Sequence, residues 1–321
     1  MIKDLVSVLT PCYNGEKHIN RLFDSILKQD YSSIEMIVVN DGSTDRTIEI
    51  IEKYIPLFNK KGYLLQYINQ ENQGQSVAIK NGLKYVKGEF LVWPDSDDFY
   101  HQTNAISLLV SNLKNLDDTY TLVRGRLQYV DYVSLRTHNI TPYICKTDLF
   151  EDCLYNQNNM YYGAGCYMAK MCHVKKLVND IYTEKLAGQN WQLLLPLMYS
   201  NKCHTIDKII YSVTENPMSH CRKKRTYTNL IEHISMYEHT RIETLNRILT
   251  IPTDIKNKYI KNVQIIATID KLLISYGHYK VNEFVKYYDL LKKDKAITLK
   301  INVYNFIIQH YWIYKLLRKI R

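Results

Sequence analysis

Apolar and polar residues follow two alternating periods over the first third of the chain. Short apolar runs predict buried strands at residues 5–10, 34–39, 63–68 and 89–93. Between them, apolar residues spaced three and four apart predict helices at residues 19–27, 48–55, 74–86 and 104–113. Strands that alternate with helices in this way form a mostly parallel sheet with helices on both faces. The pattern therefore predicts an α/β fold for this part of the chain.

The pattern changes in the last third of the chain. Apolar residues at helical spacing recur over residues 230–248, 260–273 and 281–291. We therefore expect an α/β domain over residues 1–225 and an α-helical C-terminal extension over residues 226–321.

Each predicted strand of the first four ends in a polar loop, at residues 11–15, 40–45, 70–74 and 95–98. Because the carboxyl ends of parallel strands meet at one edge of a sheet, these loops should form one cleft. The loop Asp95-Ser96-Asp97-Asp98 is the most informative, since its carboxylates repel one another and are ligands that suit Mg²⁺ or Mn²⁺. A purely structural polar turn is the alternative.

Charge and cysteine content narrow the classes of function. The net charge of +10 favours a polyanionic partner such as a phosphate-bearing substrate or an anionic membrane, while no nucleic-acid recognition module is readable. Seven cysteines without a Cys-x-x-Cys pair argue against a disulfide framework and structural zinc, and fit a cytoplasmic location. The first residues show no signal peptide. No uncharged apolar stretch reaches the roughly 18 to 20 residues of a membrane span.

Four segments resemble the family 2 glycosyltransferases of the GT-A fold, in the same order and spacing. They are Val-Ser-Val-Leu-Thr-Pro-Cys-Tyr-Asn at 6–14, Asn-Asp-Gly-Ser-Thr-Asp at 40–45, Asn-Gln-Gly-Gln-Ser at 72–76, and Trp-Pro-Asp-Ser-Asp-Asp at 93–98. The glycine motifs of dinucleotide-binding and P-loop proteins are missing after the first strand. The resemblance implies a metal-dependent, inverting hexosyl- or N-acetylhexosaminyltransferase that uses a nucleotide sugar, UDP-linked, and a hydroxyl acceptor.

The resemblance also implies roles for residues on the donor side. Asp41 would bind the nucleobase, and Asp97 would bind the metal directly. Lys80 stands where relatives carry an arginine and would face the diphosphate, with simple solvent exposure as the alternative. The remaining nucleotide and metal contacts would come from Pro11, Tyr13, Asn14, Asp95 and Ser96, with Asp95 near both the ribose and the metal.

The second half departs from the family pattern. Gln189 and Asn190 occupy the helix start where inverting members carry Glu-Asp, with the Asp as general base. An amide orients an acceptor hydroxyl but does not accept its proton. Either another carboxylate such as Glu184 is the base, or the acceptor is activated by its surroundings, or the chain is a catalytically weak nucleotide-sugar-binding scaffold. His220 resembles the family's late metal-binding histidine, with a solvated loop histidine as the alternative.

Two further segments and one residue can each be interpreted in two ways. Residues 161–169 predict a strand that either lines the acceptor or belongs to the core. Asp45 is interpreted as a carboxylate at a helix N-terminus rather than a ligand. The apolar residues 301–314, followed by the basic residues 315–321, predict a helix that lies in a membrane interface or packs on protein.

These patterns combine into one expected function. We expect a glycosyltransferase of bacterial surface-polysaccharide or capsule biosynthesis, acting on a saccharide or lipid-linked acceptor. It would be cytoplasmic, with peripheral contact to the inner face of the membrane through the C-terminal helix. A nucleotidyltransferase on a similar fold is the other enzyme considered, but it requires a Gly-rich basic loop where residues 11–15 stand.

Overall fold

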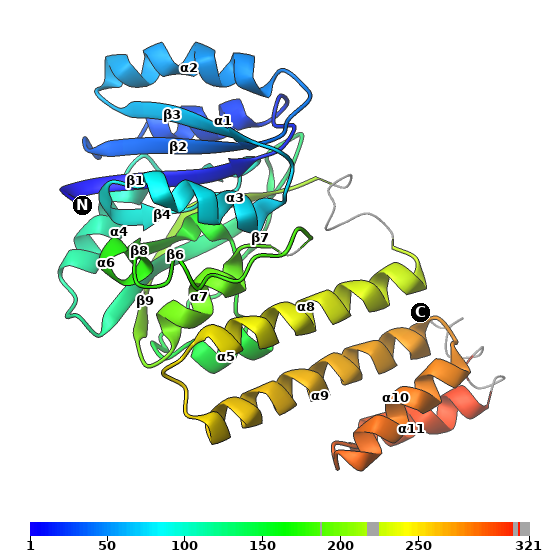
Figure 1. Ribbon diagram of the computed structural model, residues 1–321. Helices are drawn as coiled ribbons and strands as arrows, with labels where there is room; N and C mark the ends of the chain where they lie inside the picture. Colours follow the sequence, from blue (N-terminus) through cyan, green and yellow to red (C-terminus); the bar gives the residue numbers. More distant parts are fainter. Residues whose placement is uncertain (187, 217–224, 311–313, 315–321) are drawn as a thin grey trace. The chain divides into compact units, whose positions relative to one another are not determined.

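The computed structural model describes residues 1–186, 188–216, 225–310 and 314 (Figure 1). The chain divides into two compact units, Met1–Arg222 and Lys223–Arg321. The strands of the first unit are β1 (Ile2–Cys12), β2 (Ile34–Asp41), β3 (Leu64–Gln70), β4 (Gly88–Val92), β5 (Phe99–Tyr100), β6 (Tyr120–Asp131), β7 (Thr137–Ile140), β8 (Tyr167–Lys170) and β9 (Lys202–Glu215). Its helices are α1 (Ile19–Leu27), α2 (Thr47–Lys61), α3 (Gln75–Gly82), α4 (Ala105–Lys114), α5 (Phe150–Tyr155), α6 (Met171–Val174) and α7 (Asn190–Met198).

The described strands form one nine-stranded sheet in the order β3-β2-β1-β4-β8-β6-β9-β5, with β7 paired to β6. The first four strands of this order are parallel. Every residue of β2 is buried, as expected for a central parallel strand whose two faces are both covered. Gly82 allows α3 to lie close to β1 and β2, because a Cβ there would overlap Leu9 and come within 2.8 Å of Val39.

The order of the strands indicates where a ligand is expected to bind. The chain moves from β1 to β2 to β3 in one direction and then crosses back over β1 to form β4. Since such crossovers are right-handed, α1 and α2 cover one face of the sheet and α3 the other (Figure 1). The direction of winding therefore reverses between β1 and β4. Ligands bind at such a reversal, beyond the carboxyl ends of the strands.

The sheet becomes mixed beyond β4. β8 runs antiparallel to both β4 and β6, whereas β6 is parallel to β9. Sequence pattern did not predict β6, because Arg124 and Arg126 interrupt its apolar residues. Arg124 is nonetheless fully buried, where it donates to the Tyr167 hydroxyl at 3.0 Å and lies 4.2 Å from the centre of the Tyr161 ring.

The strand predicted over residues 161–169 is shorter in the structure. Only Tyr167 and the residues after it join the sheet, and Ala164–Cys166 forms a 3₁₀ turn instead. The close packing of this turn explains the difference, because a Cβ at Gly165 would overlap the Tyr211 ring and one at Gly163 would lie 2.5 Å from Leu127. These glycines serve core packing, which favours the core interpretation of the segment.

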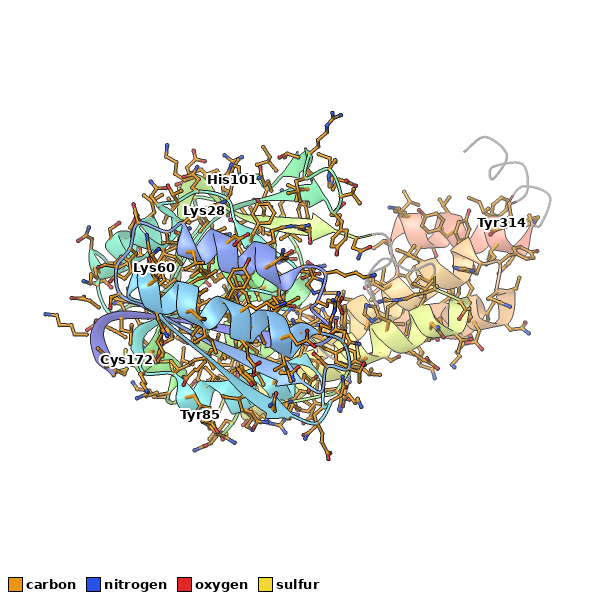
Figure 2. The ribbon with its side chains drawn as sticks, turned by 90° about the horizontal axis from the view of Figure 1, so that it is seen from above. Lys28, Lys60, Tyr85, His101, Cys172 and Tyr314 are labelled. Atoms are coloured by element: carbon orange, nitrogen blue, oxygen red, sulfur yellow. The ribbon has the colours of Figure 1, made fainter. Side chains whose placement is uncertain are left out.

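The second unit is helical. Its helices are α8 (Tyr227–Arg247), α9 (Thr253–Gly277), α10 (Val281–Lys293) and α11 (Leu299–Gln309). A core of its own is formed by Leu272, Phe284, Tyr287, Leu291, Ile301 and Ile308. Tyr314 belongs to this unit (Figure 2), where its hydroxyl donates to the Gly277 carbonyl at 3.0 Å. No helix in the described part of the chain is both long enough and apolar enough to cross a membrane.

Candidate active site

The loops after β1 and β2 are held together by hydrogen bonds. The Asn14 N–H donates to the Ser43 hydroxyl at 2.9 Å, and the Asn14 side-chain oxygen accepts from the Thr44 N–H at 2.9 Å. Asn14 has a φ of 52°, a left-handed conformation that asparagine tolerates. Pro11 is buried at the end of β1, whereas Tyr13 is 48% exposed and faces solvent. The first loop is therefore shaped by the second.

Asp45 joins the same two loops. Its carboxylate accepts from the Thr47 N–H at 3.1 Å, at the first residue of α2, and from the Glu16 N–H at 3.0 Å. Burial alone would raise the pKa of Asp45, but hydrogen bonds from the Thr47 hydroxyl and from the Glu16 and Thr47 N–H groups hold it below its usual value. This is the helix N-terminal role expected from the sequence.

Asp41 connects β2 to the loop after β3. One carboxylate oxygen accepts from the Gln70 side chain at 2.7 Å and the Gln73 N–H at 2.8 Å, and the other accepts from the Gly74 N–H at 2.9 Å. Asp41 is only 4% exposed. The structure thus gives Asp41 a loop-organising role, and its contact with a nucleobase stays a prediction.

Asp95 lies between two amide side chains. Its Oδ1 accepts from Gln75 Nε2 at 2.5 Å and from Gln189 Nε2 at 2.9 Å. Burial and the neighbouring charge of Asp97 raise the pKa of Asp95 to about 7, against the two amide hydrogen bonds, which lower it. Sequence reasoning assigned Gln189 to the acceptor and gave Gln75 no role. The structure brings both to the predicted donor carboxylate.

The other residues of the acidic loop have distinct surroundings. Asp98 is 3% exposed and accepts from the Thr214 N–H at 2.8 Å, which fixes the loop to β9. Burial, followed by the charges of Asp97 and Asp95, raises the pKa of Asp98 well above its usual range. Ser96 lies beside the Cys12 thiol. Asp98 is thus a buried structural partner of β9.

His18 was not predicted as a site residue. It precedes α1 and is partly buried near the carboxylates of Asp97 and Asp45. Burial lowers the pKa of His18, and the two carboxylates oppose that shift. The available sequence signal was its position four residues after Asn14, just before the helix.

The start of α7 carries amide oxygens without partners. Within the described residues, no hydrogen-bond donor reaches the buried side-chain oxygens of Gln189, Asn190 and Gln192. Gln189 and Gln192 are each 1% exposed. A buried acceptor without a donor costs about 1–3 kcal/mol. The start of α7 therefore holds three buried acceptors that no described protein group satisfies.

The segment before α7 crosses the start of α3. The Ser76 hydroxyl accepts from the Glu184 N–H at 2.9 Å and donates to the Glu184 carbonyl at 2.8 Å. Gly74, with φ of 91°, makes room for the crossing, because a Cβ there would overlap the Lys185 carbonyl. This crossing brings the backbone of Glu184 next to the helix that supplies Gln75.

Lys80 holds a nearby part of the same segment. Its ammonium donates to the carbonyls of Asn179 at 3.2 Å and Ile181 at 3.0 Å. The side chain therefore has backbone partners on the protein. Contact between Lys80 and a diphosphate stays a prediction.

The acidic loop fits a hard divalent cation. Among the described residues, no group of three or more His, Cys, Asp or Glu side chains is arranged to hold a metal. Two carboxylates are nevertheless enough for Mg²⁺, which completes its coordination with phosphate oxygens and water. A cation would also relieve the repulsion that raises the pKa of Asp95 beside Asp97. His220, the third predicted metal ligand, lies outside the described residues.

Residues 7–173, more than half of the chain, match the sequence model of glycosyl transferase family 2. The chain belongs to this family. The match begins within β1, includes β2 to β4 and the acidic loop, and ends before Gln189 and Asn190. The protein is thus a family 2 glycosyltransferase, and helix α7 lies beyond the matched segment.

Curated relatives are bacterial glycosyltransferases. The chain is 39% identical over 102 residues to glycosyltransferase GlyA of Streptococcus pneumoniae, covering 32% of this chain and 14% of that protein. It is 36% identical over 138 residues to an uncharacterized glycosyltransferase of Rickettsia typhi, covering 43% of this chain and 41% of that protein. The matches thus span less than half the length of these relatives.

Solved structures show the same fold. TarS residues 1–349 of S. aureus, in complex with UDP-GlcNAc, matches with a TM-score of 0.57 and 20% identity over 91% of each chain. The mannosyltransferase PcManGT of Pyrobaculum calidifontis, in complex with GDP-Man and Mn²⁺, has a TM-score of 0.54 and 14% identity over 97% of this chain and 86% of that one. The fold is GT-A, with a helical C-terminal part.

Proposed function

We propose that this family 2 enzyme transfers a sugar from a UDP-linked donor to a hydroxyl group, with inversion and with Mn²⁺ or Mg²⁺ bound at Asp95 and Asp97. The observation that carries the proposal is the reversal of strand order between β1 and β4. It brings the loop of Asp41 and the acidic loop to one sheet edge, where a nucleotide diphosphate is expected to bind. The UDP-GlcNAc complex of TarS supports the choice of UDP.

The residues that bind the nucleotide sugar have separate roles in this proposal. Asp41 and the loop of Pro11, Tyr13 and Asn14 hold the nucleoside. A divalent ion held by Asp95 and Asp97 would neutralise charge on the leaving nucleoside diphosphate. Gln75 and Gln189 orient Asp95, since both donate to the same carboxylate oxygen.

The acceptor side lacks a carboxylate at the start of α7. We assign the orientation of the acceptor hydroxyl to Asn190, whose side-chain oxygen is buried and has no donor among the described residues. We assign proton removal to Glu184, because Ser76 fixes its backbone beside the residue that contacts Asp95. A carboxylate supplies the acceptor capacity that the two amides lack.

The variant Glu184→Gln tests the assignment of the base. Loss of a general base typically reduces kcat by about 10²–10⁴-fold. UDP affinity, measured by calorimetry, should remain unchanged. Glu151→Gln in α5 is the matched control, because it removes a carboxylate from an exposed helix surface. An unaltered kcat in Glu184→Gln would remove Glu184 from the mechanism.

We place the reaction in bacterial surface-polysaccharide or capsule assembly on the cytoplasmic side of the membrane. The acceptor would be a saccharide, free or lipid-linked. The bacterial glycosyltransferases among the relatives support this setting.

A donor screen tests the proposed function. UDP-sugars and GDP-mannose are incubated with Mn²⁺, the protein and a pool of lipid-linked bacterial acceptors, and nucleotide release is measured. Release of UDP from one UDP-sugar, lost in Asp97→Asn, is the expected result. Release of GDP alone would contradict the UDP assignment. Tight UDP binding without turnover of any donor would instead favour the scaffold, for which the amides Gln189 and Asn190 are the specific evidence.

A further inference from the structure

The net positive charge of the chain comes from its C-terminal unit. Residues 223–321 contain 19 Lys and Arg against 8 Asp and Glu, whereas residues 1–222 contain 23 against 24. The whole net charge of +10 therefore resides in the helical part. This part contains none of the residues assigned to the transfer reaction, so its charge calls for a separate explanation.

Helix α11 has one apolar face packed inside and another exposed. Ile301 and Ile308 are 4% and 0% exposed in the core shared with α10. On the other side, Leu299, Val303 and Phe306 are 82%, 48% and 56% exposed. Their spacing of four and three residues places them along a single stripe of the helix. The inner face fixes the helix, so the outer apolar stripe is not needed for this core.

Four exposed lysines adjoin the start of this stripe. They are Lys292, Lys293, Lys295 and Lys300. Between residues 290 and 310 the one acidic residue is Asp294, whose carboxylate pairs with Lys261 at 2.5 Å. Leu290 at the end of α10 adds a further exposed apolar side chain, 42% accessible. Apolar groups and cations therefore occupy the same part of the unit, where α10 meets α11 (Figure 1).

We propose that this surface, formed by Leu299, Val303, Phe306 and the four lysines, binds the anionic face of a phospholipid bilayer. An amphipathic helix lies in the interface with its apolar stripe among the lipids, while flanking lysines bind anionic headgroups. A polyanion such as nucleic acid would engage the lysines but leave the apolar stripe in water. A second copy would cover the stripe but bring two strongly cationic units together. The lipid surface satisfies both features.

Co-sedimentation of the full chain with vesicles tests the proposal. Vesicles of phosphatidylcholine mixed with phosphatidylglycerol are compared with vesicles of phosphatidylcholine alone. Binding to the mixed vesicles, weakened by salt, is expected. The variant Leu299→Ser/Val303→Ser/Phe306→Ser and the variant Lys292→Gln/Lys293→Gln/Lys295→Gln should each weaken binding by at least about tenfold.

Helix α2 offers a matched control. It also carries an exposed leucine, Leu57 at 48%, followed by Lys60 (labelled in Figure 2) and Lys61. The variant Leu57→Ser/Lys60→Gln/Lys61→Gln should bind vesicles like the unaltered protein. Donor hydrolysis should be unchanged in all three variants, which confirms folding and separates this test from that of the transfer reaction.

Three outcomes would overturn the proposal. The first is equal vesicle binding by the serine variant. The second is binding that depends on the lysines alone and is matched by polyphosphate, which would indicate a general polyanion surface. The third is self-association that the serine substitutions abolish, without any vesicle binding, which would assign the stripe to a second copy.

Discussion

The two sides of the candidate site differ in how their polar groups are satisfied. Both carboxylate oxygens of Asp41 accept hydrogen bonds from the end of β3 and the loop that follows β3. At the start of α7, the oxygens of Gln189, Asn190 and Gln192 are buried without a donor in the described residues. The loop around Asp41 is thus organised by hydrogen bonds within the protein. The start of α7 instead holds amide oxygens for which the described protein groups supply no donor, and a buried acceptor without a donor costs free energy.

Loss of the proposed metal ligand should have the largest effect. Asp97→Asn keeps the size of the side chain but removes its charge, so transfer should fall below detection. Circular dichroism should show an intact fold. EDTA should have the same effect on the unaltered protein, reversed by Mn²⁺ or Mg²⁺. Full activity in EDTA would refute metal dependence. The site would then work with protein groups alone.

Removal of the Asp41 carboxylate should have the next largest effect. Asp41→Ala should weaken UDP binding by about 1.5–3 kcal/mol, the range for hydrogen bonds to a charged group. It also leaves the N–H groups of Gln73 and Gly74 without their acceptor, so the melting temperature should fall. Calorimetry and thermal unfolding separate the two effects. A lower melting temperature with unchanged UDP affinity would show that Asp41 organises the loop without contacting the nucleotide.

The acceptor side should respond differently. Asn190→Ala should slow transfer by roughly tenfold while UDP affinity stays constant, because Asn190 is assigned to the acceptor hydroxyl. Asn190→Asp supplies a carboxylate at the family's base position and should retain or exceed the original rate. Initial rates at saturating donor measure both variants. An unaltered rate in Asn190→Ala would show that this helix start is not the acceptor site.

The last prediction concerns the free energy of unfolding without metal. The pKa of Asp95 is raised to about 7 by burial and by Asp97. Folding therefore favours the protonated form of Asp95. Its contribution to the free energy of unfolding is fully present below about pH 4 and is lost as the pH rises through 7. In EDTA, Asp95→Asn should thus be more stable than the unaltered protein at pH 8, by about 1–3 kcal/mol. The two should converge near pH 4.

Urea unfolding at the two pH values checks this prediction. The same stability difference at pH 4 and pH 8 would show that Asp95 titrates normally. Asp118→Asn is the control, because its carboxyl lies exposed on the surface.

The sequence by itself determined the parallel half of the fold and its loops. Strands β1 to β4 and the helices between them are contiguous segments, and the period of apolar residues is a local property. Even there the structure lengthened β1 to Ile2–Cys12 and shortened the helix predicted over 74–86 to Gln75–Gly82. The family motifs were also contiguous, so the resemblance found them without knowledge of the fold.

The tertiary structure alone decided the rest, because the interactions join distant parts of the chain. Gln189 donates to Asp95 across 94 positions, and neither residue's local pattern indicates the other. Strand β6 carries Arg124 in the core, where Thr205 and the rings and hydroxyl of Tyr161 and Tyr167, all distant in sequence, supply its partners. In α11, local apolarity was evident, but packing on α10 decided which residues are buried and which form the exposed stripe. The period of apolar residues shows that a helix has an apolar face. Which surface that face packs on depends on residues that are distant in the sequence.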